Sequence, residues 1–201
     1  MERWGIIGGT FDPIHYAHLY IAKEAKNLLK LDKIIFMVAG SPPHKNLSRV
    51  TRASLRYKMV NSAIENMHGF VSSDYEIKKH GKSYTYHTLE HLKNEERELY
   101  FITGADCLID LEKWREIGRI FKAATLVVFN RPGFAEKEVE TKKKLIEDKY
   151  NTKIIFLNVK EINESSTLIR EKIKNNQDVS DLIPRQVLNI INKEELYREW
   201  G

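Results

Sequence analysis

A stretch of eleven residues near the start of the chain combines the residue types that a phosphate-binding site needs. It runs from Gly8 to His18 and reads Gly-Gly-Thr-Phe-Asp-Pro-Ile-His-Tyr-Ala-His. The glycine pair lets the backbone approach a ligand closely, because no Cβ stands in the way. The helix expected after it offers unpaired N–H groups and a partial positive charge at its start. His15 and His18 are three residues apart and share one face of that first turn. The stretch therefore predicts a site for a bound phosphate.

A second candidate phosphate site lies far along the chain. Ser165, Ser166 and Thr167 are consecutive hydroxyl residues, and Arg170 follows one helical turn after them. One interpretation is an ordinary helix cap, because serine and threonine accept hydrogen bonds from the first N–H groups of a helix. The other is an anion-binding helix N-terminus, with the Arg170 guanidinium bridging two phosphate oxygens.

Short apolar runs must form the scaffold that positions these motifs. Runs of strand length cover Trp4–Ile7, Ile34–Val38, Leu99–Thr103, Thr125–Phe129 and Ile154–Leu157, with a weaker candidate at Phe70–Ser73. Helical patterns lie between them at Leu19–Leu29, Tyr86–Lys93 and Val139–Lys149, and at Leu55, Met59, Ala63 and Met67 with i,i+4 spacing. This alternation predicts an α/β fold, a Rossmann-like doubly wound parallel sheet with helices on both faces. We expect one domain over residues 1–201, with a small C-terminal helical part at about 181–200 packed on it.

Four polar motifs follow four of the expected strands directly. They are Gly8-Gly9, the segment Gly40–Lys45, Gly104-Ala105-Asp106 and Arg131-Pro132-Gly133. Ligands of open parallel sheets bind beyond the carboxyl ends of the strands. The four motifs therefore predict a single site at that edge of the sheet.

Both phosphate motifs resemble those of a known enzyme family. The first resembles the nucleotidylyltransferase signature, in which a Gly-Gly-Thr-Phe-Asp-Pro turn precedes a His-x-Gly-His element, and Ala17 replaces the glycine of that element. The second resembles the Ile-Ser-Ser-Thr-x-Ile-Arg motif of the nicotinate mononucleotide adenylyltransferases, with Glu164 in place of the leading isoleucine. Each motif holds its family position, and the resemblance covers nearly the whole chain.

The resemblance implies roles for individual residues. It implies that His15 and His18 are catalytic. It implies an ATP site formed by Gly8, Gly9, Thr10, Phe11, Lys45, Gly104, Asp106, Ser165, Ser166, Thr167 and Arg170. On the acceptor side it implies contacts from Thr85, Trp114 and Arg131, with Trp114 stacked on a pyridine ring and N–H groups near Thr85 holding a carboxylate. Two alternatives stay open, because Trp114 also fits a core position and Lys45 also fits a solvated loop.

The activity that the resemblance implies is transfer of AMP from ATP to nicotinate mononucleotide, giving deamido-NAD and pyrophosphate in NAD biosynthesis. The acceptor phosphate is already anionic, so a direct in-line displacement needs alignment and charge neutralisation rather than a nucleophilic side chain. Mg²⁺ is the expected cofactor, held mainly by the substrate phosphates and not by protein ligands. The expected partners are ATP and nicotinate mononucleotide, with no nucleic acid and no membrane.

Three other functions remain as alternatives. The same fold could transfer AMP to nicotinamide mononucleotide or to phosphopantetheine. A nucleic-acid-binding module is a further alternative, because the net charge is +5, the pI is about 9.1 and basic residues gather at His44, Lys45, Arg49, Arg52, Arg56 and Lys58. His87 and His91 also match an H-x-x-E-H zinc pattern, which would need a third protein ligand.

The amino-acid composition is that of a globular protein, and it also bears on where in the cell the protein is expected. Hydrophobic residues make up 42% and charged residues 30% of the 201 residues, which is ordinary for such a chain. The single cysteine, Cys107, excludes an intramolecular disulfide framework and is expected to be buried and unreactive. No signal peptide or transmembrane run is visible, so we expect a cytoplasmic protein. The lysine run 142–144 is expected to be a solvated helix face.

Overall fold

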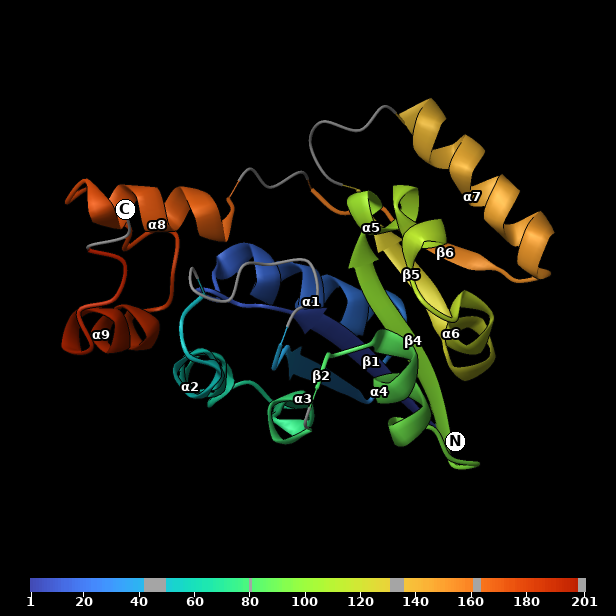
Figure 1. Cartoon of the computed structure of the whole chain (residues 1–201), viewed down its shortest axis with the longest axis horizontal. Coiled ribbons are helices and arrows are strands. Elements are labelled where there is room, and N and C mark those ends of the chain that lie inside the picture. Colours follow the sequence, from blue (N-terminus) through green and yellow to red (C-terminus); the bar gives the residue numbers. More distant parts are fainter. Residues whose placement is uncertain (42–49, 80, 131–135, 161–163, 199–201) are drawn as a thin grey trace. The chain divides into compact units, whose positions relative to one another are not determined.

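Strands and helices alternate along the chain (Figure 1), and the computed structural model describes residues 1–41, 50–79, 81–130, 136–160 and 164–198. The strands are β1 (Glu2–Gly9), β2 (Lys33–Val38), β3 (Phe70–Ser73), β4 (Arg97–Gly104), β5 (Thr125–Phe129) and β6 (Ile154–Leu157). The helices are α1 (Tyr16–Leu28), α2 (Ala53–Ile64), α3 (Tyr75–Lys78), α4 (Thr85–Leu92), α5 (Ala105–Ile109), the short 3₁₀ turn η2 (Leu111–Lys113), α6 (Ile117–Ala123), α7 (Glu136–Tyr150), α8 (Ser166–Lys174) and α9 (Arg185–Lys193).

The strands form a six-stranded sheet in the order β3-β2-β1-β4-β5-β6. β1 runs parallel to β4, β4 to β5 and β5 to β6. This is the doubly wound order of the Rossmann-like folds, in which the direction of winding reverses between β1 and β4. The α/β prediction is confirmed, and the reversal marks the carboxyl ends of β1 and β4 as the expected ligand site.

Burial explains why the strands could be recognised as continuous apolar runs. In β1 the four residues from Trp4 to Ile7 are buried, and in β4 every residue from Leu99 to Gly104 is buried. A strand with both faces covered cannot alternate apolar and polar residues, because both sets of side chains meet protein. The apolar runs therefore extend across several consecutive positions.

Two compact units make up the chain. The first comprises Met1–Gly8, Ile21–Ile35 and Tyr84–Ile162, and the second comprises Gly9–Tyr20, Phe36–Ser83 and Asn163–Gly201. Within the first, α4 packs against α6 and α5 against α7; within the second, α2 packs against α9 and β3. The predicted C-terminal helix is present as α9, which begins directly after Pro184. A single domain over the whole chain stays a prediction.

The buried face of α2 differs from the predicted one. The i,i+4 series that starts at Leu55 predicted a purely apolar stripe, but Leu55 itself is only half-buried. The residues that α2 buries are Arg56, Met59, Val60 and Ile64. The core face is therefore rotated by about one residue from the predicted stripe. The apolar pattern missed this rotation because one position of the true face holds an arginine.

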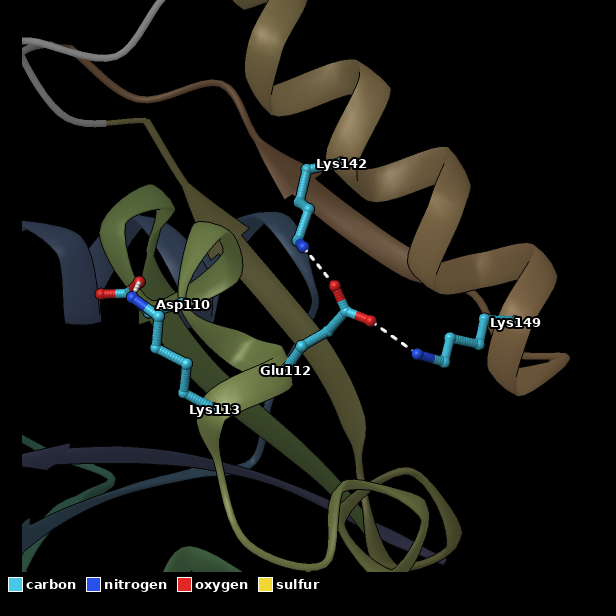
Figure 2. A network of polar contacts seen from close by, with 5 residues as sticks. All are labelled: Asp110, Glu112, Lys113, Lys142 and Lys149. Carbon is cyan, nitrogen blue, oxygen red and sulfur yellow. Dashed lines mark hydrogen bonds and ion pairs between the residues drawn. The ribbon is translucent and has the colours of Figure 1, made fainter.

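Part of the lysine run on α7 is engaged rather than solvated (Figure 2). Lys142 and Lys149 donate to the two oxygens of the Glu112 carboxylate, at 2.5 Å and 2.7 Å. These hydrogen bonds lower the pKa of Glu112 to about 2. Lys143 lies over the Phe156 ring, 5.2 Å from its centre. The helix α7 is thus tied to the η2 turn, which ends one residue before Trp114.

Candidate active site

The turn after β1 is shaped by the packing of Phe11. Phe11 has a φ of 51° and is 2% exposed. A Cβ added at Gly9 would lie 2.8 Å from the Phe11 ring, so only glycine leaves room for that ring. The ring also contacts His18 and Phe36 edge-on, at 5.1 Å and 5.6 Å between centres. The close approach that Gly9 permits is therefore an internal one, to Phe11.

His15 and His18 lie together as predicted from their spacing. Their ring centres are 3.7 Å apart, and the backbone N–H of His15 donates to Nδ1 of His18 at 3.3 Å. The helix begins at Tyr16, so His15 directly precedes it, buried, and His18 is half-buried in its first turn. Because Nδ1 of His18 accepts a hydrogen bond, the neutral ring carries its proton on Nε2, where it can be donated to an anion.

The start of α8 lies against the same turn. Ser166 Oγ donates to the carbonyl oxygen of Pro13 at 2.9 Å, and Arg170 donates to the carbonyl oxygen of Asp12 at 2.7 Å. Ser165 caps the helix by accepting from the N–H of Leu168 at 3.2 Å. The two sequence motifs, separated by about 150 residues, therefore form one structural cluster. The helix-cap interpretation is therefore correct for Ser165, whereas Ser166 bonds to the turn after β1.

Asp12 is the centre of this cluster, and its role was not visible in the sequence. It is 3% exposed, and its two carboxylate oxygens accept from the backbone N–H of Thr51 at 3.1 Å and from the Tyr197 hydroxyl at 2.7 Å. Burial, together with the neighbouring Asp12 carboxylate, raises the pKa of Tyr197, so its hydroxyl remains a donor. With Arg170 on its carbonyl, Asp12 contacts three segments that are distant in sequence.

Arg56 also holds the turn, although the sequence places it among the basic residues that suggested nucleic-acid binding. It is 1% exposed and donates to the carbonyl oxygens of Thr10, Ala39 and Thr51 at 2.7 Å to 2.8 Å. Burial lowers the pKa of Arg56, and the charge of Asp12 opposes that shift. A buried guanidinium with three carbonyl partners holds backbone segments together and is not available to nucleic acid.

The carbonyl oxygens of the turn are therefore turned toward protein donors. Thr10, Asp12 and Pro13 receive hydrogen bonds from Arg56, Arg170 and Ser166 respectively. A carbonyl oxygen that pointed at a bound phosphate would repel it, because both carry negative charge. Because these three oxygens already accept hydrogen bonds from protein donors, they point at those donors, and an anion is favoured on the side of the turn where the histidines lie.

The first unit holds the predicted residues Gly8, Gly104 and Asp106. Gly8 lies near the end of β1, and Gly104 ends β4 and caps α5. Asp106 lies in the first turn of that helix and is half-buried. Cys107 follows it and is half-buried, so the expected full burial was wrong, and the unreactive thiol stays a prediction. The parallel register pairs Ile7 with Ile102 and Gly104 with Phe129, which aligns the ends of these strands.

The predicted acceptor-side residues also lie in the first unit. Thr85 is the first residue of α4, and Trp114 closes the η2 turn with its N–H donating to Leu111 at 2.9 Å. The Trp114 ring is half-buried and contacts Phe101 edge-on at 6.0 Å between centres. Phe101 gives the Trp114 ring a partner within the protein, and stacking of that ring on a ligand stays a prediction. Lys45 and Arg131 lie outside the described residues.

The zinc pattern around His87 and His91 finds no support in the described residues. Its central acid, Glu90, forms a two-point ion pair with Arg119 at 2.7 Å and 2.6 Å, which lowers the pKa of Glu90. In the part of the chain that the structure describes, no three histidine, cysteine or acidic residues come close enough to hold a metal ion. Among the same residues, no helix is long and apolar enough to cross a membrane.

Comparison with known proteins agrees with this geometry. The sequence matches the cytidylyltransferase-like family over residues 6–172. A Clostridium botulinum protein named "Probable nicotinate-nucleotide adenylyltransferase" is 56% identical over 199 residues, which cover 99% of this chain and 100% of the relative. A Clostridium tetani protein of the same name is 52% identical and matches 98% of this chain and 100% of its own length.

The fold is also found among solved structures. The Plasmodium falciparum nicotinic acid mononucleotide adenylyltransferase, solved in complex with NaAD, superimposes with a TM-score of 0.77. The alignment covers 98% of both chains at 21% sequence identity. At that identity the likeness concerns the fold.

Proposed function

Because the chain belongs to the cytidylyltransferase-like family, we propose that it transfers AMP from ATP to nicotinate mononucleotide, giving deamido-NAD and pyrophosphate. The observation that carries the proposal is the joining of the two phosphate motifs. Arg170 and Ser166 bond to the carbonyl oxygens of Asp12 and Pro13, in the turn that leads into His15. Relatives that align over their full length with this chain are named for the same reaction.

The described residues suit a direct displacement. The acceptor phosphate attacks the α-phosphorus of ATP with an oxygen that is already anionic, so the reaction requires no general base. Two anions must be aligned and the charge of the departing pyrophosphate must be stabilised. His18 lies in the first turn of α1 with its Nδ1 held by the N–H of His15, and Arg170 places a permanent positive charge beside the turn. The remaining predicted ATP contacts would complete the site: Gly8, Gly9, Thr10, Phe11, Lys45, Gly104, Asp106, Ser165, Ser166 and Thr167.

Mg²⁺ is part of the proposal as an ion carried by the substrate. Asp12 is the acid nearest in sequence to the histidines, and both of its oxygens are engaged by Thr51 and Tyr197. That carboxylate is therefore unsuited to a metal, which fits an ion held by phosphate oxygens and water. Bound there, Mg²⁺ would neutralise part of the triphosphate charge. The lone cysteine fits a reducing compartment, and we place the reaction in the cytoplasm.

Pyrophosphate release with a panel of acceptors tests the reaction. Purified protein with ATP and Mg²⁺ is expected to release pyrophosphate with nicotinate mononucleotide. Nicotinamide mononucleotide is expected to be poorer by a factor on the order of 10–10⁴ in kcat/KM, because its NH₂ would face N–H donors near Thr85. A ratio near one contradicts the acceptor assignment, activity with phosphopantetheine alone reassigns it, and no release with any acceptor contradicts the reaction itself.

His18→Ala tests the role of the histidine pair. We expect kcat to fall about 10²–10³-fold, because one preorganised donor to a developing charge has that order of effect. The matched control is His68→Ala, which removes an exposed histidine beyond α2 and should leave kcat unchanged. Near-normal turnover of His18→Ala would remove this histidine from the mechanism.

A further inference from the structure

The segment after α9 reaches back into the catalytic turn through one buried side chain. Tyr197 is 1% exposed, and its hydroxyl donates to Oδ1 of Asp12 at 2.7 Å across 185 residues of sequence. No motif of the sequence points to this residue, and none of the predicted site residues includes it. We propose that Tyr197 is a positioning residue, which acts through Asp12 on Arg170 and on the entry to the histidine pair.

The backbone before Tyr197 is bent in a way that serves this contact. Glu195 has a φ of 50° and Tyr197 a φ of 68°, both in the left-handed region. Glu195 takes the left-handed position that commonly closes a helix, and the N–H of Leu196 donates to the carbonyl oxygen of Ile191 at 3.0 Å. The buried side chains of Val187 and Ile191 anchor α9, from which this segment starts. The turn that closes α9 therefore leads the chain directly to the buried tyrosine that contacts Asp12.

Asp12 can transmit this contact because it bonds through two separate groups. Its carboxylate is fixed by Tyr197 and by the N–H of Thr51, and its carbonyl oxygen accepts from Arg170 at 2.7 Å. The carboxylate and the carbonyl group belong to the same residue. If the carboxylate loses its hydrogen bond to Tyr197, the backbone carbonyl that accepts from Arg170 is also held less firmly. Arg170 also donates to Thr167 at 3.2 Å, so the guanidinium is held on the turn side by Asp12 and on its own helix by Thr167.

The consequence concerns catalysis more than substrate binding. This inference rests on the proposed function, in which Arg170 and His18 stabilise charge on the reacting phosphates. A small displacement of such groups costs rate, because misplacement by about 1 Å can lower turnover by about 10²-fold. Loss of the Tyr197 hydroxyl leaves the Arg170 guanidinium in the protein, and its charge still attracts the triphosphate, so the KM values should change much less than kcat.

Tyr197→Phe is the direct test, because it removes one hydroxyl and retains the ring that packs in the core. We expect kcat to fall about 10–100-fold, with the KM values for ATP and for nicotinate mononucleotide within about threefold of wild type. Assays are run well below the melting temperature, with circular dichroism to confirm the fold. The matched control is Tyr150→Phe on α7, whose ring lies against Phe121 and whose kcat should match wild type.

Coupling to Arg170 separates positioning from a purely structural role. If Tyr197 acts through Asp12 on Arg170, the double variant Tyr197→Phe with Arg170→Lys loses clearly less kcat than the product of the two single losses. A structural role predicts lower melting temperature, unchanged kcat per folded molecule and simple multiplication of the losses. Asp12→Asn is the second variant, because it changes the acceptor of the same hydrogen bond where Tyr197→Phe removes the donor. It is also expected to lower kcat with little change in KM.

The outcomes are distinguishable from failure of the proposed function. A wild-type chain that is inactive with every acceptor overturns the proposed function and this inference with it. An active wild type with Tyr197→Phe and Asp12→Asn both within twofold of its kcat overturns the inference alone. Independent multiplication of the Tyr197 and Arg170 effects also overturns it, because the path through Asp12 would then carry nothing.

Discussion

Two carboxylates in this protein each accept two short hydrogen bonds, and they differ in almost everything else. Asp12, 3% exposed, accepts from Thr51 and Tyr197 at 3.1 Å and 2.7 Å. Glu112 accepts from Lys142 and Lys149 at 2.5 Å and 2.7 Å (Figure 2), and 34% of its side chain remains exposed. By distance alone, the second carboxylate has the better contacts.

Burial reverses that order. The charges of an exposed ion pair are well hydrated when they are apart, so pairing them gains little. Salt screens the pair, and two long side chains must be held in place, so it adds little stability. Water cannot replace a lost partner of a buried carboxylate, so each partner that is removed leaves a polar group without a hydrogen bond. The contacts of Asp12 should therefore matter more than the shorter contacts of Glu112, and variants at four residues test this ranking.

The largest effect is expected for Asp12→Ala. It removes the acceptor of Thr51 and Tyr197 and leaves the buried charge of Arg56 without its carboxylate neighbour. We expect the free energy of unfolding to fall by about 3–5 kcal/mol. Urea unfolding measures this, with Asp110→Ala as the control because Asp110 pairs with Lys113 on the surface. Equal losses in the two variants would contradict the ranking.

Arg56→Lys comes next. A single ammonium cannot reach the three carbonyl oxygens that the guanidinium now satisfies, so at least one is left without a donor. The expected loss is about 2–4 kcal/mol in the same urea experiment. Arg52→Lys, at an exposed position one turn earlier, provides the control and should be neutral. A neutral Arg56→Lys would mean that water replaces the missing donors.

Arg170 should show a smaller stability effect and a distinct ligand effect. Arg170→Ala removes one charged hydrogen bond to the Asp12 carbonyl, at a cost of about 1–2 kcal/mol. Arg170→Lys should retain more ATP affinity than Arg170→Ala, although an ammonium cannot bridge two phosphate oxygens. Thermal unfolding with and without ATP separates the two effects. Equal ATP affinity in all three proteins would leave Arg170 with the structural contact alone.

Glu112→Gln should have the smallest effect among the four residues, and the size of that effect depends on pH. The pKa of Glu112 is lowered from its ordinary 4.5 to about 2, chiefly by the hydrogen bonds from Lys142 and Lys149. A lowered pKa stabilises the folded state above the unfolded value, and the contribution is lost as pH falls from about 4.5 through about 2. Melting temperatures at low salt should therefore show a small wild-type advantage at pH 7 that disappears near pH 2. An advantage that grows in acid would contradict this assignment.

The sequence predicted the scaffold well because the scaffold depends on burial over consecutive residues. The run Thr125–Phe129 is a strand with the predicted bounds, and four of its five residues are buried. The weaker candidate Phe70–Ser73 is also a strand with the predicted bounds, although none of its residues is fully buried. The helix predicted over 139–149 extends from Glu136 to Tyr150. A buried strand needs apolar residues on both faces, and that requirement is written locally in the chain.

The interior of the turn after β1 could not be predicted for the opposite reason. Arg56 lies on a buried helix face where an apolar residue was expected, and its stability comes from carbonyl oxygens of other segments. Tyr197 is one tyrosine among nine, and nothing near it in sequence indicates that it reaches Asp12. The cap at Ser165 needed only local chemistry and was correctly among the alternatives.

The contact between Asp12 and Tyr197 also sets an order of events during synthesis. The two residues are 185 positions apart, so at about 5–20 residues per second the turn waits roughly 10–40 s for its last partner. Until then Asp12 belongs to an unfinished chain in which its carboxylate lacks the tyrosine hydroxyl. If the tie positions the turn as inferred, nascent chains should fold much of the sheet before they acquire activity, and ATP should bind them more weakly than it binds the finished protein.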